Sequence, residues 1–147
     1  MPPNESEPAR FPMQIRFVMP SDPRYLPVVR AAVGNLAEAA GWNEAESRAI
    51  TLALDEALTN VIRHAYHERA DGRIELECNQ IAEGLEFRLR DTGEAPDLSK
   101  ICARQVGCDK IGGLGTHIIR DVMDSVSYQT SADGNWFVCS KRFGKTT

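Results

Sequence analysis

The stretch TLALDEALTNVIRHAY, residues 51–66, carries a carboxylate and a carboxamide at a spacing that suits joint chemistry. Glu56 and Asn60 are four residues apart, so in an α-helix their side chains lie on one face, about 40° apart around the axis. Glutamate can accept a proton from an attacking hydroxyl, and the amide oxygen of asparagine suits a hard cation such as Mg²⁺. The same spacing also fits an ordinary solvated helix face, so both interpretations stay open at this point.

A second candidate group is the segment DTGEAPD, residues 91–97, which follows a predicted strand. Asp91 ends that strand and Gly93 comes two residues later. A carboxylate at a strand end can accept a hydrogen bond from an exocyclic amine, and a glycine lets a flat ring approach the backbone. The alternative is an Asp-x-Gly turn that only closes the strand.

A third candidate is the glycine-rich start of the predicted helix in GGLGTHIIRDVMD. Backbone N–H groups at a helix start point outward at the positive end of the helix dipole, where they can bind an anion. The pattern is not the P-loop, which needs G-x-x-x-x-G-K-[ST], and it is not the dinucleotide fingerprint, which follows a strand. The sequence therefore predicts an anion site of a different type.

Hydrophobic periodicity predicts the elements that must position these groups. The predicted ranges are a strand at 13–19, helices at about 22–40 and 44–67, strands at 73–79 and 85–91, a loop at 92–111, a helix from 112, and strands at 126–130 and 135–143. Gly41 is expected to end the first helix, and Asn43 with Glu46 to cap the second. We therefore predict an α+β two-layer sandwich, with a mixed, mostly antiparallel sheet and helices on one face.

The bulk properties indicate one ordinary domain. The chain has 147 residues and a net charge of -4, which argues against a non-specific nucleic-acid partner. No apolar run approaches the ~18–20 residues of a membrane span, so we expect no membrane association and a cytoplasmic protein. We expect residues 1–12 to be a disordered tip and residues 13–147 to form the single domain.

The four cysteines show no zinc-binding spacing. Cys78 and Cys139 fall in predicted strands, where we expect them to pack as small hydrophobic residues. Cys102 and Cys108 fall in the predicted loop.

Taken together and in this order, EALTN-VIRHAY, DTG-x-x-PD and GGLG before MDSVSY resemble the N, G1 and G2 boxes of the GHKL ATPase superfamily. Within that superfamily, residues 13–143 most resemble the small anti-sigma-factor serine kinases of bacterial partner-switching systems. The resemblance implies the Bergerat (GHKL) ATP-binding fold. It also implies a protein serine/threonine kinase that uses ATP and Mg²⁺.

The resemblance also implies roles for the candidate residues. Glu56 matches the general base towards a substrate serine, and Asn60 matches the ligand of the Mg²⁺ that accompanies ATP. Asp91 matches the aspartate that contacts the adenine amine, with Gly93 beside it. By these assignments, the Glu56–Asn60 pair and the Asp91–Gly93 pair are expected to belong to one nucleotide site.

The glycine-rich helix start is expected, by the same resemblance, to hold the phosphates of ATP. The residues concerned are Gly113, Leu114, Gly115 and Thr116. The segment 98–111 matches the mobile ATP lid of the family, although it is short and has no glycine-rich middle. Its cations that could reach a γ-phosphate are Lys100, Arg104 and Lys110.

The resemblance further implies the partners: a STAS-domain anti-anti-sigma factor as phosphate acceptor, a sequestered sigma factor, and a second copy in a homodimer. One alternative is an ATP-binding regulatory module without phosphotransfer, and another is a detached histidine-kinase-like ATPase domain. Glu56 and Asn60 together favour a kinase over a pure binder. The compact N box and the short chain favour the serine kinase over the detached domain.

Overall fold

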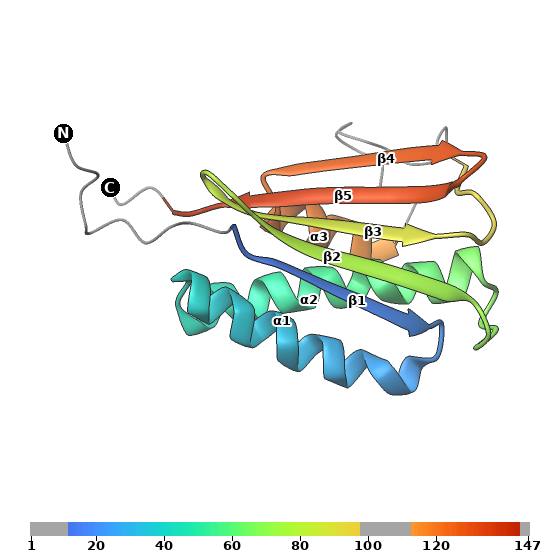
Figure 1. Cartoon of the computed structure of the whole chain (residues 1–147), viewed down its shortest axis with the longest axis horizontal. Coiled ribbons are helices and arrows are strands. Elements are labelled where there is room, and N and C mark those ends of the chain that lie inside the picture. Colours follow the sequence, from blue (N-terminus) through green and yellow to red (C-terminus); the bar gives the residue numbers. More distant parts are fainter. Residues whose placement is uncertain (1–11, 98–112, 145–147) are drawn as a thin grey trace.

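Five strands form one antiparallel sheet in the order β1-β2-β3-β5-β4, and helices cover one of its faces (Figure 1). The computed structural model describes residues 12–97 and 113–144. The elements are β1 (Gln14–Pro20), η1 (Pro23–Tyr25), α1 (Leu26–Ala40), α2 (Glu44–Asn60), η2 (Val61–Ala65), β2 (Arg73–Ile81), β3 (Gly84–Asp91), α3 (Gly113–Val122), β4 (Ser125–Ser131) and β5 (Gly134–Arg142). The predicted two-layer α+β architecture is confirmed, and all the strand pairings between these elements are antiparallel.

The predicted boundary between the first two helices is confirmed. Gly41 follows α1 with a φ of 115°, in the left-handed region that glycine adopts without strain. The side chain of Asn43 accepts a hydrogen bond from the backbone N–H of Glu46 at 2.8 Å, which caps α2. In the described part of the chain, no helix is long and apolar enough to cross a membrane.

The helical segment predicted over about 44–67 ends at Ala65, but its last turn is not α-helical. The α-helix ends at Asn60 and continues as one π-helical turn, η2, in which the N–H of Tyr66 reaches the carbonyl of Val61 at 3.1 Å. Apolar residues continue at helical spacing through this turn, so periodicity alone does not reveal the change of helix type. Single π-turns inside helices frequently occur at functional sites, and this one begins directly after a candidate metal ligand.

The hydrophobic core lies between the helices and the inner face of the sheet. Alternate residues of the strands point into it, because side chains of a strand alternate between two faces. The buried apolar residues of the inner strands are Ile74, Leu76, Cys78, Leu85, Phe87, Leu89, Phe137 and Cys139. The expected packing of Cys78 and Cys139 is therefore confirmed, whereas Cys102 and Cys108 lie outside the described residues.

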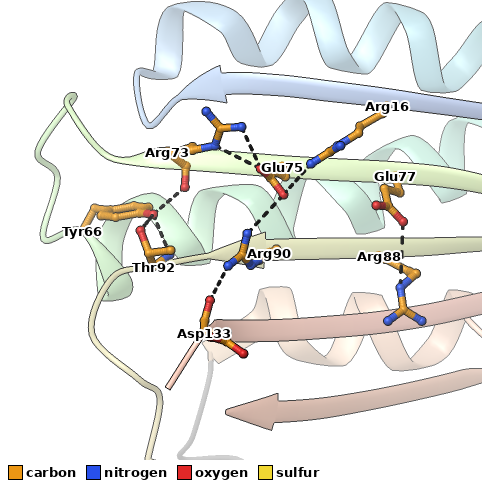
Figure 2. Close-up of polar contacts among 9 residues, drawn as sticks. All are labelled: Arg16, Tyr66, Arg73, Glu75, Glu77, Arg88, Arg90, Thr92 and Asp133. Atoms are coloured by element: carbon orange, nitrogen blue, oxygen red, sulfur yellow. Dashed lines mark hydrogen bonds and ion pairs between the residues drawn. The ribbon is translucent and has the colours of Figure 1, made fainter. Parts of the chain in front are cut away.

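The outer face of the sheet carries a network of charged side chains (Figure 2). At its centre is Glu75 on β2, which is only 6% exposed. Arg16, Arg73 and Arg90 reach its carboxylate at 3.0, 2.9 and 3.6 Å. These guanidinium groups cover Glu75, and those of Arg73 and Arg16 hold its pKa below the ordinary value, chiefly through the hydrogen bond from Arg73.

Candidate functional site

Asp91 is the last residue of β3 and lies on the inner face of the sheet. It continues the inward alternation of Leu85, Phe87 and Leu89, so its carboxylate points towards the helices and is only 6% exposed. Burial raises the pKa of Asp91, and two hydrogen bonds partly oppose that shift. Both bonds end on Oδ1, so Oδ2 carries no hydrogen bond from the residues that the structure describes.

The turn after Asp91 packs directly against the turn after α2. A Cβ on Gly93 would lie 2.4 Å from the carbonyl oxygen of Ala65, which no side chain could tolerate. The next residue, Glu94, donates its backbone N–H to the same oxygen at 2.8 Å. In the described structure, the need for glycine comes from this contact between two backbone segments. The sequence had instead suggested the approach of a flat ring.

Tyr66 joins the same two segments through its side chain (Figure 2). The tyrosine is buried, and its hydroxyl accepts a hydrogen bond from the N–H of Thr92 at 2.8 Å and donates one to the carbonyl of Arg73. A hydrogen bond between Nε2 of His67 and the carboxylate of Glu94 adds a further link. The end of the helical segment is therefore fixed to the segment that carries Asp91.

His67 and Glu68, in the turn after η2, have φ values of 50° and 64°. Positive φ is costly for residues other than glycine, and such strain persists only where the surroundings impose it. The contacts of Tyr66 and His67 supply that constraint.

Glu56 and Asn60 lie at the margin of the buried stripe of α2, as predicted. Both are half-buried, and neither side chain has a hydrogen bond or ion pair within the described residues. Their helix contacts both α1 and α3, so it lies centrally in the helical layer. The pair is therefore rigidly held by the helix backbone while its polar atoms stay available.

The available donors suit Mg²⁺ better than a metal that needs a protein cage. Within residues 12–97 and 113–144, no three His, Cys, Asp or Glu side chains come together as a metal-binding group. Mg²⁺ is commonly held by one or two protein oxygens together with substrate phosphates and water. The unpaired amide of Asn60 fits that requirement.

The backbone of α3 is helical from Gly113, so the predicted glycine-rich helix start is confirmed. The first N–H groups of a helix have no partner within it, which makes this end suitable for phosphate. The predicted lid, residues 98–111, falls outside the described residues, and so do Lys100, Arg104 and Lys110.

Sequence reasoning missed two residues that shape this region, Asn135 and Tyr66. Asn135 donates from Nδ2 to Asp91 Oδ1 at 2.8 Å and to the carbonyl of Gly93 at 3.0 Å. The sequence does contain a clue to Asn135. It alternates with Phe137 and Cys139 along the strand, so it faces inward and places an amide on an otherwise apolar face. Tyr66 offered no comparable signal, because a buried tyrosine next to a helix end is common.

The comparison with protein families gives the class of the domain. Residues 19–141 match the histidine kinase-like ATPase domain. Two of the solved structures that match show the shared fold. One contains the RsbU and RsbW domains of a Mycobacterium tuberculosis protein, with a TM-score of 0.60, 13% identity, and coverage of 88% of this chain and 32% of that one. The other is a blue-light activated histidine kinase from Erythrobacter litoralis, with a TM-score of 0.55, 17% identity, and coverage of 84% and 42%.

Curated relatives narrow the class to one family. The serine-protein kinase RsbW of Listeria innocua is 32% identical over 121 residues, which is 77% of either chain. The serine-protein kinase RsbW of Bacillus subtilis is 26% identical over 123 residues, covering 78% of this chain and 77% of the relative. The chain belongs to the RsbW family of serine-protein kinases, within the GHKL ATPase superfamily.

Proposed function

We propose that this kinase transfers the γ-phosphate of Mg·ATP to a serine of a STAS-domain anti-anti-sigma factor, and that it also sequesters a sigma factor. The observation that carries the proposal is the contact between two motifs far apart in sequence. The turn after the Glu56–Asn60 helix packs on the turn after Asp91, through Ala65 and Gly93. An acid, an amide and a buried carboxylate are thereby held on adjoining, rigidly connected segments.

Each side chain then has one task. Glu56 takes the proton of the attacking serine hydroxyl. This role suits an unpaired carboxylate at the margin of the buried stripe of α2. Asp91 accepts a hydrogen bond from the adenine amine, and Gly93 keeps the adjoining turn closed. The α3 start, from Gly113 to Thr116, binds the phosphates through its N–H groups.

Asn60 would hold Mg²⁺ through its amide oxygen. When bound, the ion neutralises charge on the phosphates and helps to orient them. The protein contributes by fixing the backbone of Asn60 at the end of α2, so little backbone freedom is lost on binding.

We extend the proposal to the whole unit: residues 13–147 act as one kinase domain, as a homodimer in the cytoplasm. The family relationship supports this extension. Light scattering on the purified protein measures the dimer directly, and a monomer at all concentrations would contradict it.

The central experiment measures phosphotransfer from Mg·ATP to a cognate STAS protein. We expect Glu56→Gln to bind ATP normally but to lose about 100-fold or more in transfer rate, because general-base catalysis commonly contributes that much. Glu44→Gln is the matched control, since Glu44 is an exposed acid on the same helix. Equal transfer by Glu56→Gln and the control would remove Glu56 from the mechanism.

Asn60→Ala separates the metal role from catalysis. We expect weaker ATP binding in the presence of Mg²⁺ and little change in its absence, because only the metal-dependent part is lost. Asn35→Ala, at an exposed position of α1, serves as the control. Unchanged affinity for Mg·ATP would contradict the metal role.

The phosphorylated product distinguishes the remaining alternatives. An acid-stable phosphoserine supports the proposal. An acid-labile phosphohistidine would identify a detached histidine-kinase-like domain, and ATP binding with no product on any cognate partner would identify a regulatory module.

A further inference from the structure

Asn135 holds the carboxylate of Asp91 from the neighbouring strand. The two residues face each other in the antiparallel register of β3 and β5, and Asn135 is only 7% exposed. Its Nδ2 group donates to Asp91 Oδ1 at 2.8 Å and to the carbonyl of Gly93 at 3.0 Å. Because one amide group carries two N–H donors, a single side chain can orient the carboxylate and close the turn after it.

This arrangement makes the two oxygens of Asp91 unequal. Oδ1 receives Asn135 and the N–H of Gly93 at 3.0 Å, whereas Oδ2 receives no hydrogen bond from a described residue. A carboxylate held at one oxygen cannot rotate freely, so the direction of Oδ2 is fixed. Gly134 permits the close packing of the strands here, because a Cβ at that position would lie 2.7 Å from the carbonyl oxygen of Asp91.

Within residues 12–97 and 113–144, the groups in contact with Asp91 are neutral dipoles rather than cations. Its partner across β2 is Ile74, its partner across β5 is Asn135, and the turn beside it packs on Ala65. The causes of its pKa shift are burial and the two hydrogen bonds from Asn135 and Gly93. The orientation of Asp91 therefore depends on these two donors.

We propose that Asn135 is a positioning residue that determines adenine selectivity, by holding Asp91 so that Oδ2 accepts the exocyclic amine of the base. This inference rests on the proposed function, in which Asp91 reads adenine. It adds a residue that does not itself need to touch the nucleotide. Asn135 would therefore affect which base the site prefers, in addition to any effect on the stability of the fold.

The test compares the affinity of the full chain for ATP and for purine riboside triphosphate, which lacks only the amine. We expect the wild type to prefer ATP by roughly tenfold or more, the usual value of a hydrogen bond to a charged group. Asn135→Ala should lose most of that preference. Asn79→Ala, which removes a half-buried amide from β2 of the same sheet, should retain it.

The pH dependence of ATP binding supplies a readout that a purely structural role would not move. Binding needs the ionised form of Asp91, so affinity falls as the pH drops through the pKa of that group. The hydrogen bond from Asn135 lowers this pKa, so its removal in Asn135→Ala should raise the pKa. The acid limit of ATP binding, meaning the pH below which affinity falls, should then move to higher pH in Asn135→Ala. The control Asn79→Ala should leave this pH unchanged.

Asn135→Thr keeps one donor for Asp91 and loses the bond to Gly93, so we expect an intermediate preference and a nearly normal acid limit. This variant carries the test if Asn135→Ala does not fold. Full ATP preference together with an unchanged pH dependence of ATP binding in Asn135→Ala would overturn the inference. If Asn135→Ala does not fold, full ATP preference in Asn135→Thr would overturn it. A wild type that binds both nucleotides equally would instead contradict the proposed role of Asp91.

Discussion

Two carboxylates on neighbouring strands are equally buried, yet they are held in opposite ways. Glu75 on β2 and Asp91 on β3 are each 6% exposed, on the outer and inner faces of the sheet. Arginines surround Glu75 and lower its pKa, whereas the donors to Asp91 among the described residues are neutral and its pKa is raised. Arginines contact both oxygens of the first carboxylate, whereas the second has one oxygen, Oδ2, without a hydrogen bond from any described residue.

The comparison shows why burial alone does not identify a functional acid. A buried anion with a full set of cations contributes to structure, and its removal leaves cations unpaired. A buried anion with an incomplete set of donors costs folding energy, and it can recover that energy by taking up a proton or by binding a further donor. The two residues should therefore respond in opposite ways to the same neutralising substitution.

The largest effect is expected from Asp91→Asn. The amide can no longer accept the adenine amine in the same way, so we expect ATP affinity to fall about 100-fold, as for a lost hydrogen bond to a charged group. Isothermal titration calorimetry with Mg·ATP measures the change. An affinity within about threefold of the wild type would contradict the proposed role.

Asp91→Asn should not destabilise the free protein. A carboxyl whose folded pKa is raised stabilises the fold fully below its unfolded pKa, near 3.8, and that stability is lost as pH rises through the folded pKa. At neutral pH the substitution removes this cost. Thermal unfolding without nucleotide should show an equal or higher midpoint, and a clear decrease would mean that Asp91 is structural, like Glu75.

Tyr66→Phe tests the link between the two halves of the site. The substitution leaves the N–H of Thr92 and the carbonyl of Arg73 without their partner, so we expect a loss of about 1–3 kcal/mol in stability. ATP affinity should fall as well, because Thr92 adjoins Asp91. Tyr128→Phe is the control, since that hydroxyl has no hydrogen bond within the described residues. Equal effects of the two substitutions would remove Tyr66 from this role.

The smallest effect is expected from Glu75→Gln, at about 1 kcal/mol, because its arginine partners are partly exposed. A carboxyl with a lowered pKa stabilises the fold above its unfolded pKa, near 4.5, and this stability is lost as the pH falls through the folded value. Urea unfolding between pH 7 and pH 3 measures the free energy of unfolding at each pH. This free energy should fall less steeply with decreasing pH in the variant than in the wild type. ATP affinity should stay unchanged, and a decrease would break the contrast with Asp91.

The sequence predicted this site unevenly, for physical reasons. Local patterns determine which face of a helix or strand a residue occupies, so the positions of Glu56, Asn60 and Asp91 followed from periodicity. The α-to-π change after Asn60 did not, because the apolar spacing continues across it. Asn135 depends on strand register, which brings residues 44 positions apart into contact and is not a local property.

The central claim is that one nucleotide joins Asn60 and Asp91. The most direct measurement is a crystal structure of the chain with Mg²⁺ and a non-hydrolysable ATP analogue. We expect the adenine amine at hydrogen-bond distance, about 2.7–3.2 Å, from Asp91 Oδ2, and Mg²⁺ about 2.1 Å from the amide oxygen of Asn60. A base bound away from Asp91, or an ion bound without Asn60, would contradict it.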